Sequence, residues 1–210
     1  MKLQKSYLSR KAEIRKRLSE FRSVWKQSDE RIFAELAFCL CTPQSKAKSC
    51  WDAVSSLKDS GTLYKGSEEE IKKVLHKKVR FHKNKVGYIL QAREIFTMEG
   101  KLSVRKKLIS LGTPFEMREW LVSNIKGLGY KEASHFLRNI GLGKDIAILD
   151  RHILKNLKRQ GVIREIPKTL TPKKYKEIEE KMRSFSKKVR IPMDELDLLF
   201  WSEETGEVFK

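Results

Sequence analysis

Residues 126–139 read KGLGYKEASHFLRN, and this stretch predicts two helices joined by a glycine hairpin. The preceding residues, FEMREWLVSNI at 115–125, follow an amphipathic helical pattern. Gly127 and Gly129 permit the tight turn between the two helices. Lys131 then falls in the first turn of the second helix, where the positive end of the helix dipole disfavours a cation. The lysine is therefore either turned towards solvent or placed there for its chemistry.

The hairpin glycines suggest an anion site. Glycines leave backbone N–H groups uncovered, and where such a turn opens a helix these groups point outward towards an anion. In a basic protein we expect that anion to be a nucleic-acid phosphate. A GxG pattern alone is weak, however, and a plain helix–helix turn is the simpler competing interpretation.

Asp150 is the candidate partner of Lys131. It follows the apolar run Ile146–Leu149 and precedes another helix, so its simplest role is that of an N-cap. If the chain reverses through the turn GLGKD at 141–145, Asp150 comes to lie near the start of the helix that carries Lys131. The two would then form a working pair, because an amine can attack as a nucleophile while a carboxylate stabilises positive charge or transfers a proton.

The charge balance predicts an anionic partner. Among 210 residues, Lys and Arg number 46 and Asp and Glu 27, which gives a net charge of +19. Nucleic acid is the first expectation and an anionic membrane surface the second. No apolar run approaches the ~20 residues that span a bilayer. The three clustered cysteines, Cys39, Cys41 and Cys50, form no CxxC pair, so we expect buried free thiols in a reducing cytoplasm.

The rest of the chain predicts an all-α fold. Apolar residues recur at spacings of three and four, whereas the alternating pattern of strands is almost absent. We expect helices at about 5–25, 29–41, 44–58, 67–76, 82–98, 101–110, 114–124, 131–140, 149–160, 171–187 and 192–202.

One charge run stands out, KKVLHKKVRFHKNK at residues 72–85, which contains no acid. A solvated helix face normally mixes the two signs, so this run fits nucleic-acid binding as well as it fits a solvated face. Arg80 and Phe81 lie in a short loop within it. An aromatic side chain next to an arginine suits nucleic acid, although Phe81 is equally suited to anchor the core.

The hairpin and the segment after it carry a family resemblance. In LVSNIKGLGYKEASHFLRNIG at 121–141 and AILDRHI at 147–153, a glycine-x-glycine turn is followed by a lysine two residues later and by an aspartate that opens the next helix. This pattern resembles the helix-hairpin-helix, Gly/Pro…Asp superfamily of DNA glycosylases.

Further segments narrow the resemblance. PQSKA at 43–47, VRF at 79–81 and the tail with Trp201 and Lys210 resemble the type 2 8-oxoguanine DNA glycosylase/AP lyases. The similarity runs from about residue 30 to the end. Several superfamily members carry a four-cysteine iron–sulfur motif, but this chain has no cysteine after Cys50, as in the type 2 group.

The resemblance implies two helical domains with the helix-hairpin-helix motif at the cleft between them. The terminal domain would comprise residues 1–29 and 145–210, and the central domain residues 30–144. No metal or other cofactor is implied. The implied protein is a monomer that works on DNA in the cytoplasm, at the nucleoid, and not at a membrane.

The implied activity is excision of 8-oxoguanine from double-stranded DNA after the base has been flipped out. Lys131 would displace the base at C1′, form a Schiff base and cut the strand by β-elimination. Asp150 would support the oxocarbenium-like sugar and orient the lysine. His135 and His152 sit on helices without ligand spacing, so we interpret both as structural.

The remaining site residues are also implied by the resemblance. Gly127 and Gly129 would hold DNA phosphates, while Trp201 and Phe81 would contact the flipped base. Gln44, Ser45 and Arg80 would contact DNA around the gap or the orphan base. The terminal residue, Lys210, would accept a hydrogen bond from N7–H of 8-oxoguanine through its carboxylate, which guanine cannot donate.

Two other functions remain open from the residues alone. One is a non-enzymatic helix-hairpin-helix module that binds DNA only through its phosphates, in which Lys131 contributes nothing beyond its charge. The other is a glycosylase of the same fold that acts on a different damaged base. The base preferred opposite the lesion, and whether a monovalent cation sits on the hairpin, are likewise undecided by sequence.

Overall fold

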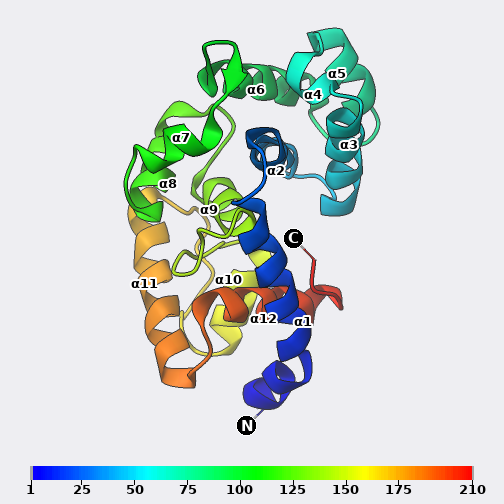
Figure 1. Ribbon diagram of the computed structural model, residues 1–210. Coiled ribbons are helices and arrows are strands. Elements are labelled where there is room, and N and C mark those ends of the chain that lie inside the picture. Colours follow the sequence, from blue (N-terminus) through cyan, green and yellow to red (C-terminus); the bar gives the residue numbers. More distant parts are fainter. Residues whose placement is uncertain (1, 210) are drawn as a thin grey trace. The chain divides into compact units, whose positions relative to one another are not determined.

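The computed structural model describes residues 2–209, and the regular secondary structure of this range is helical apart from one short two-stranded sheet (Figure 1). The predicted all-α fold is therefore confirmed, with one small addition. The described residues form these elements: α1 Lys2–Val24, α2 Asp29–Cys41, α3 Ala47–Asp59, α4 Thr62–Lys65, α5 Glu68–Leu75, α6 His82–Ile95, β1 Thr97–Met98, β2 Lys101–Leu102, α7 Val104–Ile109, α8 Pro114–Asn124, α9 Tyr130–Asn139, α10 Arg151–Arg159, α11 Pro172–Val189 and α12 Met193–Thr205.

The chain divides into two compact units. Unit 2 is the continuous stretch Val24–Phe136, and unit 1 combines the chain up to Ser23 with the chain from Leu137 onwards. One boundary falls at the last residue of α1 and the other inside α9, so each of these helices has residues in both units. The family resemblance implies boundaries elsewhere, at 29/30 and 144/145.

Unit 2 is built around α2. Ten consecutive residues of this helix, Ile32–Cys41, are buried, so α2 is enclosed on all sides and not along one stripe. Helices α3, α6 and α7 pack against it. The acid Glu35 lies in this core with no exposed surface, and its carboxylate is paired with Arg31 at 2.7 Å. Without such a partner the charged form of this buried carboxylate would be costly.

Helix starts in unit 2 follow from local chemistry. Ser67 and Thr113 each accept a hydrogen bond from the backbone three residues on, and Glu70 and Glu116 bond back to the cap, which makes two complete capping boxes. Pro114 occupies the first turn of α8, where its missing N–H costs nothing. The sequence predicted these starts within a residue.

Three short elements of unit 2 were not predicted. Strands β1 and β2 pair antiparallel, with Thr97 opposite Leu102 and Met98 opposite Lys101. They interrupt a segment for which helices were expected at 82–98 and 101–110. Each strand has two residues, which is too short to show an alternating pattern, and α4 is a single turn.

Unit 1 has its own central helix, α12, in which all residues from Met193 to Phe200 are buried. It contacts α10 and α11. Tyr7 and Arg15 of α1 both donate hydrogen bonds to the carboxylate of Glu195 on α12, at 2.5 and 3.1 Å. Arg138 pairs with Asp197 at 3.0 Å, and both side chains are 5% exposed. Two of the acids that α12 buries, Glu195 and Asp197, are thus paired with arginines of α1 and of the end of α9. Within residues 2–209 no helix has the combination of length and apolar character that crossing a membrane requires.

Candidate active site

The predicted helix-hairpin-helix motif is present in unit 2. Helix α8 ends at Asn124, and α9 begins at Tyr130. Gly127 has φ of +89°, and a Cβ at this position would lie 2.3 Å from the ring of Tyr88. Only glycine combines that left-handed backbone with such a close approach. The carbonyl of Gly129 accepts the amide of Ala133 at 2.9 Å and so opens α9.

A buried arginine braces the two helices of the motif. Arg118 of α8 is 1% exposed, and its guanidinium donates to the hydroxyl of Ser134 on α9 at 3.3 Å. It also lies over the rings of Phe115 and Tyr130, 5.7 and 5.4 Å from their centres. The angle between the helices, and hence the start of α9, is therefore held by a buried, oriented cation.

Lys131 occupies the first turn of α9, as predicted. Its side chain is 27% exposed, and its Nζ lies 3.7 Å from Oε1 of Glu132. This weak ion pair offsets the unfavourable helix dipole without enclosing the amine. Lys131 is also close enough to Cys50 for its charge to oppose the rise in that thiol's pKa, which is caused mainly by burial. The amine thus sits at a partly open position, within electrostatic reach of Cys50 in the first turn of α3.

Asp150, in unit 1, is an N-cap, which was its simplest predicted role. Its Oδ1 accepts the amides of His152 and Ile153, both at 2.8 Å, at the start of α10. Both capping bonds use the same oxygen. The second carboxylate oxygen, Oδ2, is therefore outside the cap, and capping and chemistry are compatible in one side chain.

The segment that leads to Asp150 is fastened by α11. The hydroxyl of Tyr175 donates to the carbonyl of Ala147 at 2.7 Å and accepts the amide of Leu149 at 3.2 Å. The carboxylate of Glu179 accepts the amide of Ala147 at 2.8 Å. Tyr175 and Glu179 are 2% and 3% exposed. Sequence reasoning missed both, since a tyrosine and a glutamate four residues apart on a helix resemble an ordinary half-buried face.

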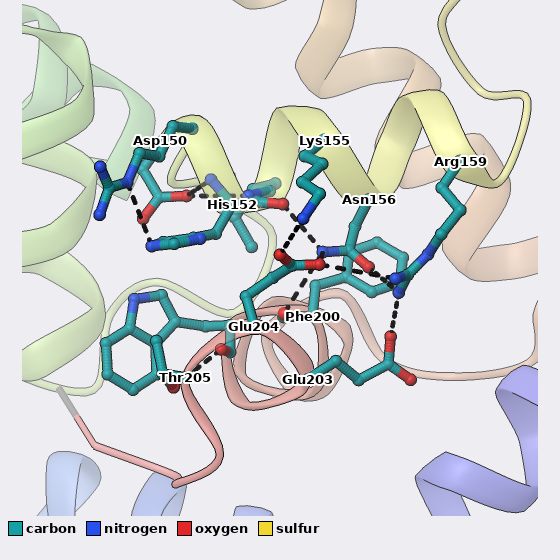
Figure 2. A network of polar contacts seen from close by, with 12 residues as sticks. Asp150, His152, Lys155, Asn156, Arg159, Phe200, Glu203, Glu204 and Thr205 are labelled. Atoms are coloured by element: carbon teal, nitrogen blue, oxygen red, sulfur yellow. Dashed lines mark hydrogen bonds and ion pairs between the residues drawn. The ribbon is translucent and has the colours of Figure 1, made fainter.

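A polar network joins α10 to α12 (Figure 2). Lys155 pairs with Glu204 at 2.6 Å, Arg159 pairs with Glu203, and the amide of Asn156 donates to Glu204 at 3.2 Å. The helix capped by Asp150 is thereby tied to the helix that carries Trp201.

Trp201 lies near the end of α12 and is partly exposed. The ring of Phe209 packs against it with a centroid distance of 6.5 Å, and Val208 is buried. Val208 and Phe209 therefore anchor the end of the chain by apolar contacts. Lys210, predicted to recognise the lesion, lies outside the described residues.

Gln44, Ser45 and Arg80 lie close together in unit 2. Gln44 and Ser45 belong to one turn and Arg80 to a second, adjacent turn. The amide of Arg80 donates to Oγ of Ser45 at 3.0 Å. Gln44 and Arg80 are exposed, and the Arg80 guanidinium lies 5.6 Å from the ring centre of Phe81. Phe81 is 54% exposed, so the alternative that it anchors the core is wrong.

Three further expectations, on the run 72–85, the cysteines and His135, have different outcomes. The run 72–85 is not solvated throughout, because Lys85 is buried with 3% exposure. The three cysteines are buried and free, as predicted, and within residues 2–209 no three His, Cys, Asp or Glu side chains are placed to share a metal ion. His135 is buried edge-on against Phe38, which fits the structural role expected for it.

Comparison with known proteins places these features in one family. A sequence model described as 8-oxoguanine DNA glycosylase matches residues 14–191. A protein of Fusobacterium nucleatum named 8-oxoguanine DNA glycosylase/AP lyase is 49% identical over 99% of this chain and 96% of its own length. A protein of Methanocaldococcus jannaschii with the same name is 41% identical over 94% of this chain and 91% of its own.

Solved structures agree with the sequence matches. The M. jannaschii 8-oxoguanine glycosylase/lyase, in complex with a 15mer DNA containing 8-oxoguanine, matches with a TM-score of 0.89 and 38% identity over the full length of both chains. The Thermotoga maritima 8-oxoguanine DNA glycosylase matches with a TM-score of 0.87 and 33% identity over 100% of this chain and 97% of its own. Together with the glycine hairpin, the lysine that opens α9 and the aspartate that opens α10, these matches show that the chain belongs to the 8-oxoguanine DNA glycosylase family.

Proposed function

We propose that this protein excises 8-oxoguanine from double-stranded DNA and then cuts the strand through a Schiff base on Lys131. The observation that carries the proposal is the position of Lys131, a partly open amine in the first turn of the helix-hairpin-helix motif. Relatives at 49% and 41% identity named 8-oxoguanine DNA glycosylase/AP lyase support the same activity, as does the similar structure that holds 8-oxoguanine DNA.

In the proposed reaction the neutral amine of Lys131 attacks C1′ of the damaged nucleotide. The N-glycosidic bond breaks, and its electron pair leaves with the base, which takes up a proton. Nitrogen loses a proton, and cleavage of the C1′–O4′ bond, whose oxygen takes up a proton, then opens the sugar ring and gives the protonated imine. Removal of a C2′ proton then expels the 3′ phosphate by β-elimination. Nucleophilic catalysis of this kind splits one difficult step into several easier ones.

We assign Asp150 to the charge that develops on the sugar. The cap fixes Oδ1, so the carboxylate is held in one orientation while Oδ2 is available to the reacting centre. A carboxylate oriented in advance stabilises positive charge without reorganising at the moment of reaction. Because the tie from Tyr175 to the preceding segment is buried, it supports this orientation.

DNA binding is assigned to the hairpin and the basic run. The exposed amides at Gly127 and Gly129 would contact phosphates, together with the exposed lysines and Arg80 of the segment 72–83. We assign Trp201 to the flipped base, because it is aromatic and partly exposed, and we assign Phe81, whose exposed ring lies beside Arg80, to the DNA around the lesion. Recognition of N7–H by Lys210 stays a prediction from sequence. We further propose that the protein acts as a monomer at the nucleoid.

The test is a short duplex with one 8-oxoguanine, with released base measured by chromatography and strand cutting measured on a denaturing gel. The proposal expects both products from the wild type and neither from Lys131→Gln, with duplex binding of the variant little changed. Binding without either product would leave a non-enzymatic DNA-binding module. Rapid removal of an oxidised pyrimidine or a mispaired base, with 8-oxoguanine untouched, would assign the same fold to another lesion.

A further inference from the structure

Lys85 is a buried lysine whose hydrogen bonds all go to the end of α2 and the turn that follows it. It lies in the first turn of α6 and is 3% exposed. Its ammonium donates to the carbonyls of Cys41 and Pro43, both at 2.7 Å, and to Oγ of Ser45 at 3.1 Å. An ammonium has three N–H donors, and each has an acceptor here. The side chain is therefore fully engaged inside the protein and is not part of the solvated basic face.

The position of these acceptors explains why a cation is buried there. Cys41 is the last residue of α2, where unpaired carbonyls concentrate negative partial charge, and Pro43 belongs to the turn after that helix. Burial lowers the pKa of the Lys85 ammonium, while the nearby thiols and Glu132 act in the opposite direction. Glu132 is the residue whose carboxylate lies 3.7 Å from Lys131. The charge of the buried lysine is thus within electrostatic reach of Glu132, in the first turn of the helix that carries the proposed nucleophile.

Ser45 joins this turn to a second one. Its hydroxyl accepts from Lys85 and from the backbone amide of Arg80 at 3.0 Å, and it donates to the carbonyl of Pro43 at 3.4 Å. One donor and two lone pairs are the full capacity of a serine hydroxyl. The turns 42–46 and 76–81 are therefore connected through one atom, Oγ of Ser45, and Lys85 donates a hydrogen bond to the same atom.

Both turns carry exposed residues in a strained backbone conformation. Gln44 has φ of +56° and Phe81 has φ of +55°, and Lys77 in the second turn has φ of +64°. Residues other than glycine adopt this left-handed region only where the surroundings enforce it, and such strain gathers at functional sites. Gln44 and Phe81 are the exposed tips next to the Ser45 joint.

We propose that Lys85, acting through Ser45, is a positioning residue that holds Gln44, Arg80 and Phe81 as one preformed unit for entry into duplex DNA at the lesion. This inference rests on the proposed function. These three residues offer one amide, one guanidinium and one aromatic ring. Such groups suit the unpaired base and the space that the flipped base leaves beside it. Ser45 itself, which the sequence suggested as a DNA contact, serves instead as the joint.

The test compares two substrates under single-turnover conditions, both cut by the same enzyme. One is duplex DNA with 8-oxoguanine, whose base must leave the helix. The other is a single strand with one abasic site, which has no opposite base and no helix to open. Lys85→Met keeps most of the side-chain volume and removes all three donors. We expect it to slow excision from the duplex by about 10- to 100-fold, as misplacement of a binding group by about an ångström does. Cutting of the single strand should fall far less.

Three variants control this measurement. Lys58→Met removes one charge from α3 of the same unit, where the ammonium pairs with Asp59, and should leave the ratio of the two rates as in the wild type. If Lys85→Met does not fold, Ser45→Ala removes the joint alone and should lower the ratio, and Ser45→Thr, which restores the hydroxyl, should recover it.

The outcomes separate the two proposals. If folded Lys85→Met and Ser45→Ala lose activity equally on both substrates, or keep the wild-type ratio of the two rates, the positioning role is overturned. The proposed function would still stand in that case. A wild-type protein that cuts neither substrate would overturn the proposed function and this inference with it.

Discussion

Replacing Tyr175 with phenylalanine tests how the segment before Asp150 is held. The change removes one oxygen and keeps the ring, so packing in the core of unit 1 is unaltered. The hydroxyl now bonds to the carbonyl of Ala147 and the amide of Leu149, and those two residues are 0% and 2% exposed. Water cannot easily replace the lost oxygen, so Tyr175→Phe leaves two buried backbone groups without this partner.

The magnitude comes from the two groups. Each buried polar group left unsatisfied costs about 1–3 kcal/mol, so we expect a loss of about 2–6 kcal/mol in the free energy of unfolding. For a chain of this size each kcal/mol lowers the melting temperature by about 2–4 °C, which gives a fall of about 4–24 °C. Base excision should slow as well, because the carboxylate of Asp150 loses part of its support.

The assay is thermal unfolding measured by circular dichroism, with Tyr64→Phe as the matched control. The Tyr64 hydroxyl also donates to a backbone carbonyl, that of Glu30 at 3.1 Å, but at an exposed position where water can take its place. The control should move the melting temperature by no more than a few degrees, in keeping with a solvated hydrogen bond worth about 0.5–1.5 kcal/mol. Equal, small shifts in both variants would refute the buried tie.

The charges of the protein support three further predictions. Asp150→Asn should slow base excision by about 10²-fold or more, while the amide oxygen continues to cap α10 and stability changes little; a collapse in stability with normal activity per folded molecule would reduce Asp150 to a cap. Affinity for undamaged duplex, measured by fluorescence anisotropy, should fall by about 10³-fold or more between about 50 and 200 mM salt if roughly six or more phosphates are neutralised; a flat response would remove the basic run from the interface. Burial raises the pKa of Asp197 from 3.8 to about 7 despite the opposing charge of Arg138. An acid with a raised pKa stabilises the native state below its unfolded value and loses that contribution as pH rises towards the folded value. Asp197→Asn should therefore gain stability relative to the wild type as urea unfolding is repeated from about pH 4 to about pH 7, whereas a constant difference would mean that Arg138 keeps Asp197 ionised throughout.

The sequence was a good guide to whatever local chemistry decides. The capping boxes at Ser67 and Thr113 defined two helix starts, because the residue types that cap a helix rarely serve elsewhere in that pattern. The hairpin was predicted for the same reason, since Gly127 needs a conformation that other residues avoid. Lys131 was found because a cation at the start of a helix contradicts the usual preference.

Tertiary contacts explain what the sequence could not show. Lys85 resembled the other lysines of its run, and only the fold places its ammonium on the carbonyls that end α2. Tyr175 supports Asp150 from 25 residues away in the chain, where no local pattern links them. Gln44 lies in a left-handed conformation with no glycine to announce it. Each of these features depends on a partner distant in sequence, and neither composition nor local spacing predicts which residue that partner is.

The most direct test of the central claim is to identify the amine that reacts with DNA. The wild-type protein is incubated with an 8-oxoguanine duplex in borohydride, which reduces a Schiff base to a stable bond, and the adduct is digested and sequenced by mass spectrometry. We predict one modified peptide, with the DNA remnant on Lys131, and no covalent adduct with Lys131→Gln. A remnant on any other amine, or full trapping of the Lys131→Gln variant, would contradict the account.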